Sequence, residues 1–184
     1  MHSQARDSLK DCQDIGRMTR TLRQSAERIR KRLGIFCMTS EKDNILMWSH
    51  YANDHTGFCL GFKTRNAEGE PVLGQVPLPV DYASNRPCLN LIEKLDPKEL
   101  SHALLTKAED WKRESEWRIV DHKTGPGIHQ FPADALCEVI LGCRITPGNR
   151  NRVMRWCRER DPQPAVFWAE EKDREFGLDI VPIS

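Results

Sequence analysis

The sequence lacks the short patterns that identify several common enzyme classes. It contains no Gly-rich phosphate loop, no H-E-x-x-H, no G-x-S-x-G and no glycine pattern of a dinucleotide-binding fold. These absences disfavour common hydrolase, kinase and Rossmann chemistry.

Two further absences concern charge and long apolar runs. Lys and Arg total 28 against 27 Asp and Glu, so the whole chain carries no field that would draw it onto DNA or a membrane. No apolar run approaches the roughly 18 residues of a membrane span, and the N-terminus lacks the apolar core of a secretory signal. We therefore expect a cytoplasmic protein in which any basic patch is local.

The seven cysteines form no C-x-x-C pair and are odd in number. Most have apolar neighbours, so we expect them to be reduced and mostly buried.

The two histidines nearest each other in a candidate helix region, His50 and His55, are five residues apart, whereas helical metal ligands lie three or four apart. No metal site is predicted.

The N-terminal segment has the pattern of a long amphipathic helix over residues 5–33, with Gly34 as its C-terminal cap. Its polar face is basic, which is typical either of a solvated surface or of a surface that contacts nucleic acid or an acidic partner. We expect residues 1–34 to form this helix and residues 35–184 to form a single α+β domain. The basic residues of the helix are Arg17, Arg20, Arg23, Arg28, Arg30, Lys31 and Arg32.

The rest of the chain mixes short strands and helices without repeats. We predict six to eight short strands, among them strands near 34–40, 57–62, 116–120 and 137–142 and two more near the C-terminus. Helices are expected from Asp43 or Asn44 to about Asn53, in the stretch 95–111 with its Asp96-Pro97 start signal, and over 147–160. This order favours an α+β fold with a mixed, strongly bent or split β-sheet and two or three helices besides the N-terminal one.

The aromatic-rich stretch at 44–62 is interpreted mainly as core. Trp48 lies three residues from Ile45 and Tyr51, so its indole is expected to be buried and to find a partner for its N–H. His50 lies on another side of this helix, where it can line a cleft and titrate near neutral pH. Along the strand at 57–62, the glycine face leaves room for a packed helix or, as the alternative, a ligand. The predicted buried residues are Trp48, Phe58, Leu60, Ile119, Val139 and Leu141.

The segment "WKRESEWR" at 111–118 carries the main functional signal. In a strand, Glu114, Glu116 and Arg118 would share one face. Two neighbouring carboxylates raise each other's proton affinity and Arg118 opposes this, which is a way of tuning an acid or base. The alternative is a solvated ladder of ion pairs. We predict that Glu116 is at least partly buried and paired with Arg118 or another cation.

Four stretches together resemble the bacterial domain family of unknown function numbered 2971. They are "DNILMWSHYANDHTGFCLGF" at 43–62, "VDY" at 80–82, W-x-x-E-x-E-W-R-I at 111–119 and L-x-x-V-I-L-G at 136–142. Members of that family usually begin with an additional segment that contains a first strand and an Asn-Asp-Pro turn. This chain therefore resembles a shortened member or a fragment of one.

The Glu114-Ser115-Glu116 sequence also resembles the Glu-x-Glu turn of ADP-ribosyltransferases, in which the second Glu holds a ribose hydroxyl of NAD. The stretch "CMTS" at 37–40 is similar to the Ser-Thr-Ser element of those enzymes. The first-strand Arg or His that grips NAD in them has no counterpart here. The resemblance implies NAD as cofactor or substrate and a transferase reaction.

Two hypotheses stay open from the sequence. In the first, an enzyme-type cleft uses Glu116 as acid, base or ribose anchor with help from Glu114, while Arg118 holds an anion. In the second, the chain is a non-catalytic interaction module that binds nucleic acid or an acidic partner through the basic residues from Arg17 to Arg32. In the first hypothesis His50 is a further catalytic residue and closes the cleft together with Tyr51. The residues expected to contact substrate, besides Arg118, are Tyr51, Ser40 and Trp48.

Overall fold

The structure is a computed structural model that describes residues 20–21, 24, 27–28, 31–88 and 96–183. The expected N-terminal helix at 5–33 lies mostly outside these residues. Gly34 is not its cap as predicted, because Gly34 is the first residue of a strand that is hydrogen-bonded to a neighbouring strand. In the described part of the chain, no helix combines the length and apolar character that a membrane span requires.

Nine strands form three sheets, with helices and 3-10 turns (η) between them, in the described residues. The expectation of a mixed α and β fold with a split sheet is confirmed, with one strand more than the six to eight that the sequence suggested. The elements are β1 (Gly34–Thr39), α2 (Ile45–Tyr51), β2 (Phe58–Phe62), β3 (Leu78–Pro79), β4 (Asp81–Ala83), α3 (Pro97–Leu105), β5 (Thr106–Ala108), η1 (Glu109–Glu114), β6 (Glu116–Asp121), η2 (Ala133–Ala135), β7 (Leu136–Leu141), α4 (Pro147–Arg158), β8 (Ala165–Glu171) and β9 (Leu178–Pro182).

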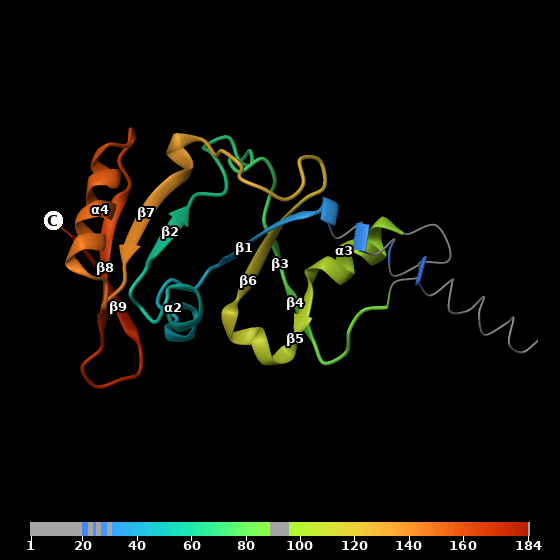
Figure 1. Cartoon of the computed structure of the whole chain (residues 1–184), viewed down its shortest axis with the longest axis horizontal. Helices are drawn as coiled ribbons and strands as arrows, with labels where there is room; N and C mark the ends of the chain where they lie inside the picture. The colour runs from blue at the N-terminus through green and yellow to red at the C-terminus, as the bar shows by residue number, and fades with distance from the viewer. Residues whose placement is uncertain (1–19, 22–23, 25–26, 29–30, 89–95, 184) are drawn as a thin grey trace, which may run out of the picture.

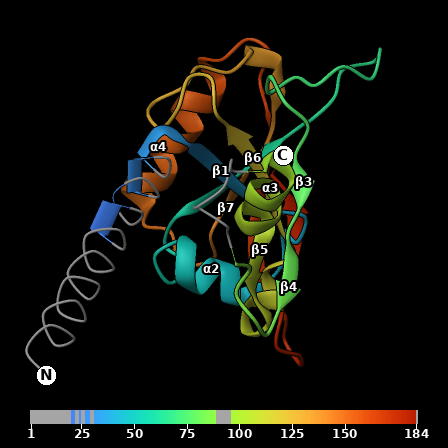
Figure 2. The same cartoon turned by 90° about the vertical axis from the view of Figure 1, so that its right-hand side faces the viewer.

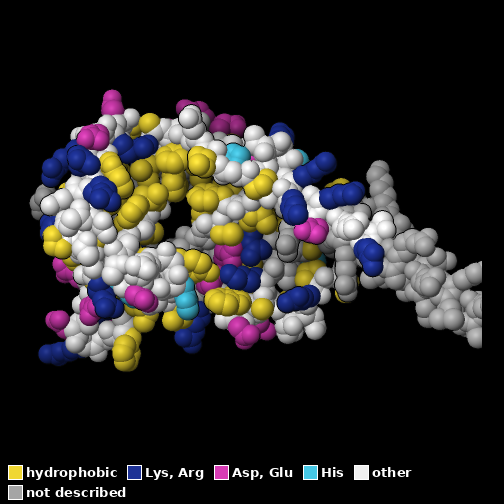
Figure 3. Space-filling view, viewed as in Figure 1, with side chains coloured by type: hydrophobic (Ala, Val, Ile, Leu, Met, Phe, Trp, Pro, Cys, Tyr) yellow, Lys and Arg dark blue, Asp and Glu magenta, His cyan; other side chains and the backbone are white. Residues whose placement is uncertain are grey.

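The three sheets are arranged in a row. The three-stranded sheet, in the order β1-β6-β3, lies between the four-stranded sheet β2-β7-β8-β9 and the parallel pair β4-β5 (Figure 1). The segment between β2 and β3 projects away from the rest of the molecule (Figure 2). Figure 3 shows a hollow bordered by hydrophobic side chains between the two larger sheets. An edge-to-face series of Phe36, Phe62 and Phe131 connects those sheets.

The core lies on both faces of the four-stranded sheet. One face packs against α4 through Val139, Leu141, Val153 and Cys157. The other face packs against α2, where Trp48 is 3% exposed and its indole N–H donates to the Lys42 carbonyl at 2.8 Å. The predicted burial of Trp48, Val139 and Leu141 is thus confirmed.

The predicted burial of Phe58 and Leu60 is wrong, since each is 41% exposed. Both belong to β2, which is an edge strand. They pair in register with Leu141 and Val139 of β7. The helix α4 covers these two β7 residues. The cover therefore stops before β2, so the apolar side chains on that face remain exposed. The opposite face follows the expectation of a packed helix, because Cys59 contacts the cluster that contains Trp48.

The helix start signals are confirmed. Asn44 caps α2 by accepting from the backbone N–H groups of Leu46 and Met47, and Asp96 caps α3 by accepting from that of Lys98. In α3, however, the helix ends at Leu105 and the chain continues directly into β5. This early end places Lys107 in an extended segment beside β4, in register with Tyr82.

Candidate functional site

The site is built around two buried carboxylates, Glu114 and Glu116, each 6% exposed. The prediction that Glu114 shares a strand face with Glu116 is wrong. Glu114 ends η1, Ser115 has a left-handed backbone with φ 46°, and β6 begins only at Glu116. The left-handed residue turns the chain so that both carboxylates nevertheless reach the same cation.

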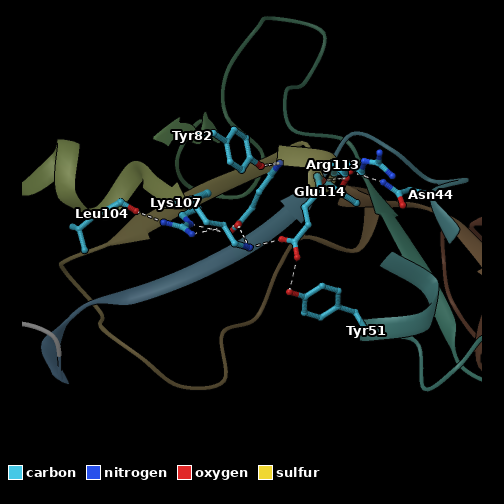
Figure 4. A network of polar contacts seen from close by, with 10 residues as sticks. Asn44, Tyr51, Tyr82, Leu104, Lys107, Arg113 and Glu114 are labelled. Atoms are coloured by element: carbon cyan, nitrogen blue, oxygen red, sulfur yellow. Dashed lines mark hydrogen bonds and ion pairs between the residues drawn. The ribbon is translucent and has the colours of Figure 1, made fainter. Parts of the chain in front are cut away.

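That cation is Lys107 of β5. Its Nζ contacts Oε2 of Glu114 and lies 2.8 Å from Oε2 of Glu116. Figure 4 shows Lys107 reaching the carboxylate of Glu114 from one side, and Tyr51 of α2 reaching it from the other. Lys107 therefore joins the two carboxylates into one cluster.

The second cation, Arg118, binds Glu116 on the same face of β6, as predicted. Its Nε lies 2.8 Å from Oε1 and its Nη2 3.3 Å from Oε2 of that carboxylate. Its Nη1 donates to the carbonyl of Leu104 in the last turn of α3. Two anions and two cations, all largely buried, thus form a neutral cluster, called here the charge network: Lys107, Glu114, Glu116 and Arg118.

Contacts within the charge network move the pKa values of Glu116, Lys107 and Arg118 toward their charged forms. Burial acts to raise the pKa of Glu116, but hydrogen bonds from Arg118, Cys37 and Lys107 outweigh this and lower it to about 2. Burial acts to lower the pKa of Lys107, and its bonds to Glu114 and Glu116 reverse this and raise it. Glu116 is therefore a carboxylate at neutral pH and has no proton to give, which leaves the role of charge stabiliser or hydroxyl acceptor.

Hydrogen bonds between side chains of other elements and the backbone of residues 113–116 hold the two carboxylates in place. The backbone N–H of Glu116 donates to the Tyr82 hydroxyl at 2.9 Å, and the Thr39 hydroxyl donates to the Glu114 carbonyl at 2.7 Å. The Asn44 side chain, which caps α2, also donates to the carbonyl of Arg113. Contacts from β1, β4 and α2 thus converge on the junction between η1 and β6.

On the solvent side, three aromatic side chains border the charge network: His50, Tyr51 and Trp111, called here the aromatic rim. Tyr51 is 65% exposed and donates to Oε1 of Glu114 at 3.0 Å. Trp111 lies under Lys107 Nζ at 5.1 Å, and His50 meets Trp111 edge to face at 6.1 Å. The site thus combines exposed ring surface with a buried carboxylate that is paired with Lys107.

The structure brings together four of the residues proposed from the sequence, Glu114, Glu116, Arg118 and Tyr51, with His50 at the rim. It does not bring Ser40 or Trp48 to them. Ser40 is exposed just beyond β1, and its neighbour Thr39 makes the contact to Glu114 instead. Trp48 lies in the core under the four-stranded sheet.

Sequence reasoning missed Lys107, Tyr82, Trp111 and Cys37. Lys107 precedes Glu114 by seven residues in a stretch that was interpreted as helix, so no local pattern marked it. Cys37 pairs in register with Arg118. Desolvation, together with the hydrogen bond and charge of Glu116, raises the pKa of the Cys37 thiol to about 11.

Most of the described cysteines are less buried than the sequence led us to expect. The described cysteines are free, as expected, but of these only Cys157 is buried, whereas Cys37, Cys88 and Cys137 are exposed.

In the part of the chain that the structure describes, no group of three or more His, Cys, Asp or Glu side chains is placed to hold a metal ion.

One comparison with known proteins gives a match. The model of the family described as "Protein of unknown function (DUF2971)" matches residues 47–119, from α2 into β6. No curated protein and no solved structure matches the chain. The matched segment runs through all of the residues of the charge network and of the aromatic rim. The match supports the resemblance to this family, whose description assigns no activity.

Proposed function

We propose that the chain handles NAD or a related nucleotide at the charge network, in the manner of an ADP-ribosyltransferase. One observation carries the proposal. Two buried carboxylates of a Glu-x-Glu sequence, each paired with a largely buried cation, lie directly beneath an exposed aromatic rim.

The chemistry of the ligand class suits both parts of the site. Ribose hydroxyls donate to carboxylates, and hydrogen bonds to an ionised group are about twice as strong as neutral ones. The adenine or nicotinamide ring can stack on exposed aromatic side chains such as Tyr51 or Trp111. A preorganised, ionised carboxylate stabilises the positive charge that develops on the ribose as its bond to nicotinamide breaks.

The proposal divides the roles of the two carboxylates. Glu114 is the hydroxyl acceptor, because its Oε1 faces the rim and contacts Tyr51. Glu116 stabilises charge, because both of its oxygens are already bound by Lys107 and Arg118. Arg118 positions Glu116 here. It is not assigned to a ligand anion as the sequence suggested, since its guanidinium is engaged by Glu116 and the Leu104 carbonyl.

Calorimetric titration of NAD, ADP-ribose and nicotinamide into the wild-type chain tests the ligand class. Heat with NAD and ADP-ribose, and weaker binding of nicotinamide alone, is the expected result, because the ribose supplies the hydroxyls that Glu114 accepts. Absence of binding for NAD and ADP-ribose at millimolar concentration would rule out nucleotide handling by this chain.

The alternative, an interaction module that binds nucleic acid or an acidic partner through Arg17 to Arg32, concerns a segment that is largely outside the described residues. Among the described ones, Arg20, Arg28 and Arg32 are exposed, and Lys31 pairs with Glu27 at 2.9 Å. This alternative stays a proposal, and filter binding of nucleic acid at rising salt tests it, since phosphate contacts make retention salt-sensitive.

A further inference from the structure

The helix α4 has a buried side and an exposed side of different character. Val153 and Cys157 are buried against the four-stranded sheet. The exposed side carries Arg152, Arg155, Trp156 and Arg158, called here the α4 basic face. Because residues three and four apart are neighbours on a helix, Arg152 lies next to both Arg155 and Trp156. Arg152 and Arg158 are separated by about 9 Å along the helix axis.

Most of this positive charge is not neutralised within the described part of the chain. Of the three arginines, Arg155 alone has an ion pair there, with Glu159 at 4.0 Å, and both of those side chains are more than half exposed. Figure 3 shows Lys and Arg side chains gathered over the part of the surface where α4 lies in Figure 1. The charge network differs, since each of its cations contacts a buried carboxylate.

Stabilisation of α4 by positive charge near its C-terminal end explains only some of the arginines of the α4 basic face. Arg155 and Arg158 lie in the last turn, where positive charge interacts favourably with the helix dipole. Arg152 lies nearer the middle of the helix, beside another cation, and gains less from the dipole. Trp156 is 47% exposed and belongs to neither core cluster. Arg150 and Arg160 are set apart because their guanidinium groups stack on Trp168 and Phe131.

We propose that the α4 basic face binds single-stranded nucleic acid. The three arginines contact successive phosphates, and Trp156 stacks on a base. This combination of a basic surface with an exposed aromatic ring is the one by which proteins bind single strands with little sequence preference. The charge of the partner is opposite to that of the face, and the ring gives the surface a preference for unpaired bases. The surface is separate from the charge network, because α4 packs on the four-stranded sheet.

Fluorescence anisotropy with a labelled 20-nucleotide oligo-dT, measured from 50 to 200 mM NaCl, tests the proposal. Three phosphate contacts at about 0.7 each predict that log K falls against log salt with a slope of about −2. Arg152→Gln should lower the magnitude of that slope by about 0.7. Trp156→Ala should weaken binding at least about fivefold at every salt concentration while leaving the slope unchanged, because stacking is not an ionic contact.

The matched control is Arg174→Gln, an exposed arginine between β8 and β9, which should bind like the wild type. Circular dichroism of each variant checks that α4 remains folded. The proposal is overturned if oligo-dT does not bind, if Arg152→Gln and Arg174→Gln have the same effect, or if Trp156→Ala keeps the wild-type affinity. Duplex DNA bound as tightly as the single strand would also overturn it.

Discussion

Arg118 binds Glu116 through two nitrogen–oxygen contacts, at 2.8 and 3.3 Å, although the two residues are only two positions apart on one face of β6. Lys107 binds the same carboxylate from β5 and extends the cluster to Glu114. The Glu-x-Glu sequence therefore does not form a solvated ladder. Its two carboxylates are buried, and the cost of removing them from water is offset by Lys107 from β5 and Arg118 on β6 itself.

The first prediction concerns the stability of this cluster. Glu116→Gln removes a buried charge and leaves Arg118 and Lys107 with one anion fewer, so we expect the free energy of unfolding to fall by about 3 to 5 kcal/mol. Urea denaturation measures the change. The matched control is Glu138→Gln, because Glu138 pairs with the half-exposed Lys42 at 3.3 Å and such pairs contribute at most about 1 kcal/mol. Equal losses in the two variants would contradict burial of the pair as the source of stability.

The second prediction concerns acid. The pKa of Glu116 is about 2 in the folded chain against a usual value of 4.5, so the unfolded state binds more protons between these values. The stabilisation that this carboxylate provides is complete above pH 4.5 and is lost as the pH falls toward 2. Unfolding free energies measured across this range should therefore decline less steeply for Glu116→Gln than for the wild type. Parallel curves would show that Glu116 does not carry this pH dependence.

The third prediction uses Cys37 as a reporter of the charge network. Its thiol has a pKa near 11 because of desolvation and the adjacent Glu116, and Arg118 acts in the opposite direction. Glu116→Gln should therefore lower that pKa and speed alkylation of Cys37 by iodoacetamide at pH 8, since the thiolate is the reactive form. Peptide mass spectrometry measures the rate at each cysteine.

The exposed Cys88 is the internal control for reagent access in that experiment, and the buried Cys157 reports on unfolding. Cys88 should react at the same rate in the two proteins, and any acceleration at Cys157 measures the greater unfolding of the destabilised variant. Unchanged Cys37 reactivity, or acceleration at all three cysteines, would count against a specific effect of Glu116.

The fourth prediction concerns Trp48, which joins α2 to the four-stranded sheet. Trp48→Ala should cost about 3 to 5 kcal/mol, because it opens a cavity in the core and leaves the Lys42 carbonyl without its donor. Trp48→Phe is the matched variant: it retains most of the apolar contact but not the N–H, so its loss should be smaller. Thermal denaturation of the two variants and the parent measures both stability losses. An unshifted melting temperature for Trp48→Ala would refute the assignment of Trp48 to the core.

The elements that the sequence predicted well are those marked by local signals. Asn44 and Asp96 start helices as their capping side chains indicated, and the apolar run at 136–141 is a buried strand. Burial was less predictable, because it depends on what lies across the sheet. The alternation that marked Phe58 and Leu60 as one face of a strand was right, but β2 is an edge strand beyond the reach of α4.

The candidate site shows the same limit. The spacing of Glu114, Glu116 and Arg118 pointed to a charged cluster, yet it assumed a continuous strand, which the left-handed Ser115 interrupts. Lys107 could not be found from spacing, because its proximity depends on the early end of α3 and the pairing of β5 with β4. Tertiary contacts of this kind leave no periodic signal in the sequence.

The central claim is that the charge network serves a ligand as well as the fold, and paired measurements on Glu114→Gln test it most directly. The affinity for NAD by calorimetry and the free energy of unfolding are measured together, with Glu138→Gln as the matched control. We predict that Glu114→Gln weakens NAD binding at least about tenfold, because the carboxylate that accepts the ribose hydroxyl is removed, while circular dichroism still shows a folded chain. An affinity equal to that of Glu138→Gln, together with a loss of stability, would contradict the account and leave the charge network with a structural role alone.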